Sequence, residues 1–223
     1  MTYQIAIDGP AGAGKSTIAK AVAKKMGYIY VDTGAMYRAM ALYLLRRGIS
    51  ADESGKISAA SRDADITIAY KDGLQQVLLN GENVTGLLRT EEVGNMASAS
   101  SVNKDVRLKL VELQRALAER ENVVMDGRDI GTYVLPKANV KVYLTASSAC
   151  RAKRRYDELT EKGETCDLAA IEADIIERDK RDMEREFAPL RQAEDATYVD
   201  SSDMTISQVV QRILDIYREK AED

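Results

Sequence analysis

The sequence contains no histidine and no tryptophan, and only one phenylalanine, three prolines and two cysteines among its 223 residues. Without histidine, the chain cannot build a His-based catalytic triad or a zinc site of the Cys/His kind. Two cysteines in a chain of this length do not make a disulfide framework, so a reducing compartment, the cytoplasm, is expected. The chemistry of any active site must therefore come from other side chains.

Long hydrophobic runs are also missing, since no stretch approaches the length that is needed to span a bilayer. The first residues lead straight into an apolar strand pattern, without the charged leader and apolar core of a signal peptide. The formal net charge of −4 argues against a nucleic-acid polymer as the main partner, so any basic site must be local. With 45% hydrophobic and 30% charged residues, the chain is expected to form one globular unit without a membrane partner.

A glycine-rich segment with a lysine stands near the start of the chain. Residues 9–16 read Gly-Pro-Ala-Gly-Ala-Gly-Lys-Ser and fit the P-loop pattern G-x-x-x-x-G-K-[ST]. The apolar residues 3–7 before it predict a buried strand, and apolar residues at every fourth position of 18–26 predict a helix after it. Such a loop gathers backbone N–H groups around a polyphosphate, with Lys15 on the β- and γ-phosphates and the Ser16 hydroxyl on Mg²⁺. The segment therefore predicts binding of a nucleoside triphosphate.

Strand and helix patterns alternate along most of the chain. Apolar runs of strand length occur at residues 3–7, 28–31, 122–125, 140–144 and 197–199. Helical patterns occur at residues 18–26, 34–47, 89–120 in two pieces, 149–191 with a break near 162–163, and 206–217. This alternation predicts an α/β fold whose mainly parallel, doubly wound sheet holds ligands at the carboxyl ends of its strands. Thr33 is expected to cap the helix that follows the second strand.

Residues 65–85 depart from this alternation. Two short β-like runs there are joined by Lys71-Asp72-Gly73, and Asn80-Gly81 makes the next turn. Asp-Gly and Asn-Gly between such runs are strong hairpin signals, so a small antiparallel sheet is predicted. An insertion into the main fold is favoured, and a hairpin that extends the main sheet is the alternative.

P-loop proteins differ in what accompanies the phosphate loop. The guanine-reading motif Asn-Lys-x-Asp is missing, because the nearest match, residues 103–106, lacks the final aspartate. The strand at 122–125 ends in Asp126-Gly127 and not in the Asp-Glu of motor and transporter ATPases. The chain instead carries many arginines, namely Arg38, Arg89, Arg107, Arg128, Arg151, Arg154, Arg155, Arg178, Arg181 and Arg185. A second anionic substrate, to which a phosphoryl group is transferred, explains this number better than a triphosphate alone.

The absence of histidine bears on the nature of that acceptor. A hydroxyl acceptor must lose its proton, and kinases of such substrates normally place a carboxylate against it. A nucleoside monophosphate offers an oxygen that is already ionised at pH 7 and needs no base. Catalysis then consists of positioning and of neutralising charge on the transferred phosphoryl group, to which one arginine acting in cis can contribute about 10³–10⁵ in rate.

Five segments, in their order along the chain, resemble the bacterial cytidylate kinases. They are the loop at 9–16, Asp-Thr-Gly-Ala-Met-Tyr-Arg at 32–38, Arg-Thr-Glu-Glu-Val at 89–93, Asp-Gly-Arg-Asp-Ile-Gly at 126–131 and Glu-Arg-Asp-Lys-Arg-Asp at 177–182. Each segment is modest alone, but five in the right order are specific, and the resemblance runs from the first strand to the final helix. One departure is conservative, since Thr33 keeps the hydroxyl of the serine that many members have there.

The resemblance implies a P-loop kinase with a single core domain over residues 1–223, a monophosphate-binding insertion at about 64–88 and a helical lid at about 151–165. It implies that ATP, with Mg²⁺, phosphorylates CMP or dCMP to the diphosphate in pyrimidine metabolism. A monomer is expected. A kinase for another pyrimidine monophosphate, UMP or dTMP, is the alternative among enzymes, and a P-loop ATPase switch that hydrolyses ATP slowly is the alternative from another class.

The resemblance also assigns roles to residues of this chain. The ATP-binding set is Gly9, Pro10, Ala11, Gly12, Ala13, Gly14, Lys15, Ser16, Thr17, Arg151 and Arg154. The CMP-binding set is Thr33, Arg107 and Asp129 for cytosine, Ser98, Arg178 and Asp182 for ribose, and Arg38, Arg128 and Arg185 for phosphate. The catalytic set is Lys15, Arg128, Arg155 and Arg185, and the metal-binding pair is Ser16 and, through water, Asp126.

Elementary chemistry supports some of these roles more than others. The Asp129 carboxylate accepts a hydrogen bond from the exocyclic amine of cytosine, whereas uracil presents an acceptor oxygen there and is repelled. The basic run 151–155 has a simpler alternative, a charged surface turn. Asp126 has one too, because an aspartate at this place can merely end a strand.

The charged helix near residue 180 leaves two interpretations open. Arg178, Arg181, Asp182 and Arg185 are spaced so that they share one helix face, which can converge on a ligand. The alternative is a solvated helix with pairs such as Glu177–Arg181, each worth only ~0.3–0.5 kcal/mol. The resemblance favours the ligand-binding interpretation by analogy.

Overall fold

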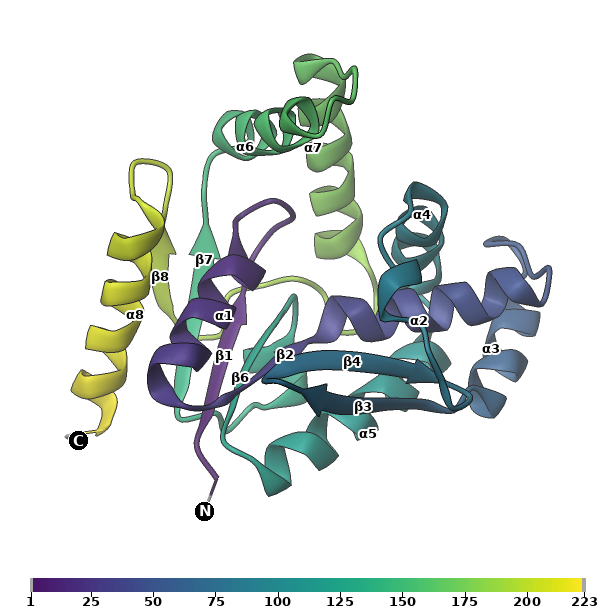
Figure 1. Ribbon diagram of the computed structural model, residues 1–223, viewed down its shortest axis with the longest axis horizontal. Coiled ribbons are helices and arrows are strands. Elements are labelled where there is room, and N and C mark those ends of the chain that lie inside the picture. The colour runs from purple at the N-terminus through teal and green to yellow at the C-terminus, as the bar shows by residue number, and fades with distance from the viewer. Residues whose placement is uncertain (1, 222–223) are drawn as a thin grey trace.

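The computed structural model describes residues 2–221, and a parallel sheet of five strands lies at the centre of this part of the chain (Figure 1). The strands are β1 (Gln4–Asp8), β2 (Ile29–Asp32), β6 (Val123–Gly127), β7 (Val140–Thr145) and β8 (Thr197–Asp200). Their order across the sheet is β2-β6-β1-β7-β8, and every neighbouring pair is parallel. The predicted parallel α/β sheet is confirmed, with each strand within two residues of its expected place.

Helices cover both faces of this sheet, which is why its strands are almost continuously apolar. The covering helices are α1 (Lys15–Met26), α2 (Thr33–Arg46), α5 (Lys104–Arg120) and α8 (Ile206–Ala221). Ile5 and Ile7 of β1 are fully buried in the core formed with α1 and α8. Ala6 between them is fully buried on the opposite face, in the core formed with α2 and α5. None of the helices within residues 2–221 is long and apolar enough to cross a membrane.

A separate antiparallel sheet lies beside the main one (Figure 1). Its strands are β3 (Ile66–Lys71), β4 (Leu74–Leu79) and β5 (Glu82–Asn83). The turn residues Asp72, Gly73, Asn80 and Gly81 have φ angles of 53°, 74°, 50° and 82°, the left-handed conformation of tight hairpin turns. The predicted antiparallel sheet is confirmed, and it does not extend the main sheet.

The small sheet is attached to the main sheet through β2. The Tyr70 hydroxyl donates a hydrogen bond to the carbonyl of Tyr30 at 3.1 Å. The Gln75 side chain accepts from the backbone N–H of Asp32 at 2.8 Å and donates to its carbonyl at 3.2 Å. The insertion therefore borders the carboxyl end of β2, where α2 begins.

The helix before this sheet, α3 (Ser54–Asp63), is not predicted by the sequence patterns. Its buried residues are Ile57, Ala60 and Ser61, which form too short and too weakly apolar a stripe to show a helical period. After the sheet come a 3₁₀ turn (Thr85–Leu87) and α4 (Glu91–Ser100). With α5, α4 confirms the two helical pieces that were expected over residues 89–120.

The start of α2 corrects one expectation. Asp32, and not Thr33, caps this helix, because the Asp32 carboxylate accepts from the N–H of Ala35 at 2.9 Å. Thr33 is the first helical residue, and its buried hydroxyl donates to the carbonyl of Asp126 at 2.6 Å. The sequence alone does not reveal that β6 brings a carbonyl to this hydroxyl.

Two helices project beyond the carboxyl end of the sheet, α6 (Ser148–Glu161) and α7 (Leu168–Glu184) (Figure 1). The predicted break between them is confirmed, but the expectation that helix continues to residue 191 is wrong. Arg185 has an extended backbone, with φ −61° and ψ 138°, and Ala188 has φ 51°. The chain folds back at this point, because Arg185 Nε donates to the carbonyl of Ala188 at 2.7 Å and the Leu190 N–H donates to the carbonyl of Asp182 at 2.8 Å. Pro189 then prevents the helix from continuing, since a proline has no N–H to donate and disfavours helical geometry in the residue before it.

Candidate active site

The phosphate loop runs from the end of β1 to the first turn of α1, as predicted. Gly9 has φ 150°, and a Cβ atom there would lie 1.9 Å from the carbonyl oxygen of Leu144 on β7. Gly14, which precedes the helix, has φ 81°. The Lys15 Nζ atom donates to the carbonyl of Pro10 at 2.6 Å. Only glycine therefore fits at position 9 of this loop. The loop leads into the N-terminus of α1, whose first N–H groups have no partner within the helix and can bind an anion.

The oxygen atoms of two predicted metal-binding residues meet beside this loop. The Ser16 hydroxyl donates to Asp126 Oδ2 at 2.9 Å, and the Tyr30 hydroxyl donates to Asp126 Oδ1 at 2.8 Å. Burial, and then the charge of Asp32, raise the pKa of Asp126. A hydroxyl and one carboxylate fit Mg²⁺, which takes few ligands from a protein and the rest from phosphates and water. The described residues hold no group of three or more cysteine, aspartate or glutamate side chains that could hold a metal ion.

Lys15 links this loop to the end of β6. Burial, and then the positive charge of Arg128, lower the pKa of Lys15 well below its usual value, while Asp126 and Asp182 act in the opposite direction. Lys15 is 5% exposed, so little water compensates its charge. Lys15 and Arg128 therefore both lie at this edge of the sheet, where the phosphates of a nucleotide would balance their positive charge.

A buried carboxylate lies just beyond β6. Asp129 is 4% exposed, and the Arg107 Nη2 atom donates to its Oδ2 atom at 2.6 Å. Arg185 approaches the other oxygen, with Nη2 at 3.5 Å from Oδ1. The Arg107 Cζ atom lies 5.3 Å from the ring centroid of Tyr37. Within residues 2–221, Arg107 Nε and Arg185 Nη2 are buried without a hydrogen-bond partner, and a ligand with acceptor atoms would satisfy them.

Three of the predicted phosphate and ribose contacts, Arg128, Arg178 and Arg185, lie around a fourth, Asp182. Arg128 Nε donates to Asp182 Oδ2 at 2.9 Å, and Arg185 Nη1 lies 3.5 Å from Asp182 Oδ1. Burial acts to raise the pKa of Asp182, but Arg128 and Arg185 outweigh it and the pKa is lowered. Burial, and then the charges of Arg128 and Arg38, lower the pKa of Arg178. The arginines exceed the carboxylates here, as a site for an anion requires.

Some charged residues at the end of α7 fit the interpretation as a ligand-binding face, and others fit the interpretation as a solvated helix. Asp182 and Arg185 belong to the buried network, although Arg185 lies beyond the helix end. Arg181 is exposed and pairs with Glu177 at 3.0 Å, as in a solvated helix. Arg181 Nη1 also donates to the hydroxyl of Ser98 on α4 at 2.9 Å, so the predicted ribose contact Ser98 has a protein partner.

The three predicted arginines of α6 have different surroundings. Arg151 is 7% exposed and binds the carbonyls of Ala11 and Ala146. Arg154 Nη2 donates to the carbonyl of Ser201, after β8, at 2.6 Å. Arg155 pairs with Glu158 at 2.9 Å, and both side chains are 48% exposed. Arg155 is thus held in an exposed ion pair, and its catalytic role stays a prediction.

Two buried aspartates that the sequence analysis does not single out contact the site. Asp179 on α7 accepts from the N–H of Ala11 in the phosphate loop at 2.9 Å. Asp8 accepts from the N–H groups of Ile130 and Gly131 at 2.8 and 2.7 Å. A signal for Asp8 was present, because it ends a buried strand and directly precedes Gly9. No spacing rule indicates Asp179, whose partner is 168 positions away.

Asp8 leads to a prediction about pH. Burial raises the pKa of Asp8 from 3.8 to about 7, against the opposing effect of its two backbone hydrogen bonds. The folded state then binds more protons than the unfolded state between about pH 4 and pH 7, so the contribution of Asp8 to stability falls as the pH rises through this window. Urea unfolding at pH 5, 6, 7 and 8 measures the free energy of unfolding of wild type and of Asp8→Asn. The difference in favour of wild type should be largest at pH 5 and smallest at pH 8. A difference that grows with pH would show that the hydrogen bonds from the two N–H groups, and not burial, determine the pKa of Asp8.

Comparison with known proteins agrees with this fold and site. The family model described as "Cytidylate kinase" matches residues 5–219. A cytidylate kinase of Caldicellulosiruptor saccharolyticus is 53% identical, over 96% of this chain and 94% of that protein. A cytidylate kinase of Bacillus subtilis is 47% identical, over 97% of both chains. The crystal structure of a gluconokinase from Sinorhizobium meliloti superimposes with a TM-score of 0.51 at 16% identity, over 99% of this chain and 94% of that one, which shows a shared fold.

The five-stranded parallel sheet, with its phosphate loop between β1 and α1, defines a P-loop protein that binds nucleotide phosphates. The family match over nearly the whole chain, together with relatives at about half identity, narrows this class. The chain belongs to the cytidylate kinase family.

Proposed function

We propose that the chain transfers the γ-phosphoryl group of ATP to CMP and dCMP, and that it releases ADP and the nucleoside diphosphate. The observation that carries this proposal is the position of Arg128. It pairs with Asp182 in the acceptor network, and it directly follows Gly127, whose register partner on β1 is Asp8, the residue before the phosphate loop. A single cation between the two halves is where a transferred phosphoryl group needs positive charge.

The donor half is the phosphate loop with the start of α1. Within residues 9–17, the segment from Gly12 onward offers backbone N–H groups to the phosphates of ATP, because Pro10 has no N–H and Asp179 binds that of Ala11. Lys15 contacts the β- and γ-phosphates. Ser16 and, through water, Asp126 hold Mg²⁺, which when bound neutralises charge on the phosphates. The 2.9 Å hydrogen bond between the two side chains supports this pair as the metal site.

The acceptor half lies around Asp129. Its carboxylate accepts from the exocyclic amine of cytosine, with Arg107 and Thr33 as further contacts to the base. The hydrogen bond from Arg107 holds the carboxylate in place and keeps its charge balanced. Ser98, Arg178 and Asp182 bind the ribose, and Arg38, Arg128 and Arg185 bind the phosphate. Within the described chain, the Nη2 atom of Arg185 has no hydrogen-bond partner, which supports the role of Arg185 as a phosphate contact.

The transfer itself needs no general base. An ionised phosphate oxygen of CMP attacks the γ-phosphorus, the bond from that phosphorus to the β–γ bridging oxygen breaks, and ADP leaves with the electron pair. Lys15, Arg128 and Arg185 counter the charge that spreads over the transferred group, and Arg155 joins them when α6 closes.

The remaining parts of the chain serve this reaction. Residues of about 64–88 form the monophosphate-binding insertion, which is supported by the contact of Gln75 with Asp32 next to Thr33. Residues of about 151–165 form a lid over ATP, in which Arg154 contacts the nucleotide. The protein acts as a monomer in the cytoplasm, where its cysteines Cys150 and Cys166 remain reduced.

An assay of ADP release across nucleoside monophosphates tests this function. Rapid turnover is expected with CMP and dCMP and much slower turnover with AMP and GMP. Turnover with AMP or GMP and none with CMP would refute the proposal. A preference for UMP or dTMP would identify a different pyrimidine kinase, and hydrolysis of ATP at the same rate without any acceptor would identify a switch-type ATPase.

A further inference from the structure

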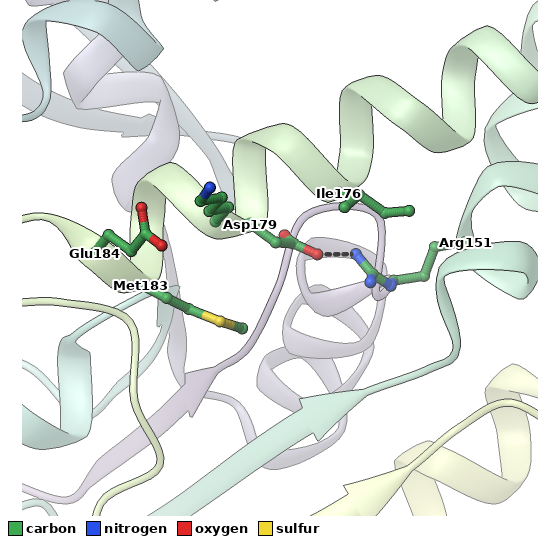
Figure 2. Close-up of a pocket in the computed structure, with 6 residues that line it drawn as sticks. Arg151, Ile176, Asp179, Met183 and Glu184 are labelled. Atoms are coloured by element: carbon green, nitrogen blue, oxygen red, sulfur yellow. Dashed lines mark hydrogen bonds and ion pairs between the residues drawn. The ribbon is translucent and has the colours of Figure 1, made fainter.

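Two buried side chains, Asp179 and Arg151, bind the backbone of Ala11 in the phosphate loop. Asp179 Oδ1 accepts from the N–H of Ala11 at 2.9 Å, and Arg151 Nη1 donates to the carbonyl of Ala11 at 2.7 Å. The two side chains also pair with each other, with Arg151 Nη1 at 2.5 Å from Asp179 Oδ2 (Figure 2). Both polar groups of the Ala11 backbone are thus bound by a single ion pair. We call this arrangement of Ala11, Arg151 and Asp179 the loop brace.

The loop brace is buried and joins distant parts of the chain. Arg151 and Asp179 are each 7% exposed, and Arg151 Nε makes a further hydrogen bond to the carbonyl of Ala146 at 2.9 Å. A buried ion pair costs desolvation free energy unless its atoms are well bonded, and these atoms are. Arg151 comes from α6 and Asp179 from α7, so both projecting helices are tied to the loop between β1 and α1.

The segment of α7 around Asp179 also faces the acceptor half of the site. Arg178 precedes Asp179, and Asp182 lies one turn later and pairs with Arg128. The helix α7 therefore contacts the phosphate loop through Asp179 and the acceptor network through Asp182. A Cβ atom at Gly12 would lie 3.3 Å from the Cβ atom of Arg151, so α6 also packs directly on the loop.

We infer that Asp179, with Arg151, is a positioning residue that holds the phosphate loop in its ATP-binding conformation before the nucleotide arrives. This inference rests on the proposed function, because it takes ATP as the ligand of the loop. Asp179 touches no substrate in this role. It acts because a loop that is already ordered loses less conformational entropy on binding, and because Ala11 is held while the later N–H groups stay free for phosphate. Arg151 acts through the loop carbonyl, in place of the direct ATP contact that the resemblance assigns to it.

Direct binding measurements on the full chain test this inference. Titration calorimetry with ATP alone, and separately with CMP alone, should show that Asp179→Asn raises the Kd for ATP about ten-fold and changes the Kd for CMP less than two-fold. Asparagine keeps one acceptor for Ala11 but loses the charge that holds Arg151. Glu184→Gln removes the same charge from an exposed position of α7 and should leave both Kd values within two-fold of wild type.

Two further variants separate positioning from general stability. Arg151→Lys keeps the charge but cannot make all of the Arg151 hydrogen bonds, so a smaller rise in the Kd for ATP, about three-fold, is expected. Adding Arg151→Gln to Asp179→Asn should weaken ATP binding no further, because the two side chains act as one unit.

The inference is wrong if Asp179→Asn and Arg151→Lys bind ATP as tightly as wild type. It is also wrong if they weaken ATP and CMP binding equally while the melting temperature falls, since that is the result of a merely structural role. Wild-type chain that binds no ATP would refute the proposed function itself, which distinguishes the two failures.

Discussion

Replacing Lys15 by methionine is expected to lower kcat about a thousand-fold, because in the proposed mechanism the transferred phosphoryl group loses a cation that counters its charge. The fold should survive this change. Burial and the nearby charge of Arg128 already disfavour the charged form of Lys15 in the free protein, as its lowered pKa shows, and methionine fills the same space. Steady-state kinetics with CMP and ATP measure the loss, and thermal unfolding measures the stability.

Lys24→Met is the matched control for this prediction. Lys24 lies on the same helix α1, and its side chain is exposed. The same substitution there should leave kcat within two-fold of wild type. If Lys15→Met kept more than a tenth of the wild-type kcat, with ATP saturating, Lys15 would not act on the transferred group.

Replacing Asp129 by asparagine is expected to lower kcat/KM for CMP about 100-fold and to lower kcat/KM for UMP much less. In the proposed site the carboxylate accepts from the amine of cytosine, and one such base contact is worth about 1–3 kcal/mol, or roughly 5–150-fold. An asparagine amide can instead donate to the acceptor oxygen of uracil, so the preference between the two bases narrows. Kinetics with both acceptors at saturating ATP measure this.

Asp129→Asn also breaks a buried pair, because Arg107 donates to this carboxylate at 2.6 Å. Breaking such a pair costs about 3–5 kcal/mol of stability, so the assay must be run well below the melting temperature of the variant. Asp182→Asn is the matched comparison, since Asp182 shares Arg185 with Asp129 and is proposed to bind the ribose, which CMP and UMP have in common. That variant should weaken both acceptors equally. Equal losses for both acceptors in Asp129→Asn would remove it as the residue that reads the base.

The elements that the sequence analysis predicted correctly are those with strong local signals. The strands β1 and β6 read as apolar runs because the sheet buries both of their faces. The turns at Asp72-Gly73 and Asn80-Gly81 were recognisable because left-handed backbone restricts the choice of residue. The elements that it missed, such as α3, have too few buried residues to leave a period. The predicted end of α7 was wrong because charged residues typical of a helix continue past Glu184, whereas the helical conformation ends there.

The family resemblance placed more of the candidate site than spacing did. The phosphate loop follows from the pattern at residues 9–16 alone, since its glycines and Lys15 are close in sequence. Asp129 and Arg107 come from different elements, and only the fold shows that they form a buried pair. The residue roles in this site remain predictions, and the variants above test them.

The sequence by itself determined the donor loop, the alternation of strands and helices, and the excess of arginine, because each depends on residues that are near one another or on composition. Only the tertiary structure decided which arginines keep an unused hydrogen-bond donor. Arg151 is bound to Ala11 and Asp179, whereas Arg185, although it forms ion pairs with Asp129 and Asp182, keeps a buried Nη2 atom without a hydrogen-bond partner in the described chain. The physical reason is that the partner of a charged side chain is set by the packing of α6, α7 and β6 around the carboxyl edge of the sheet, which no local pattern encodes.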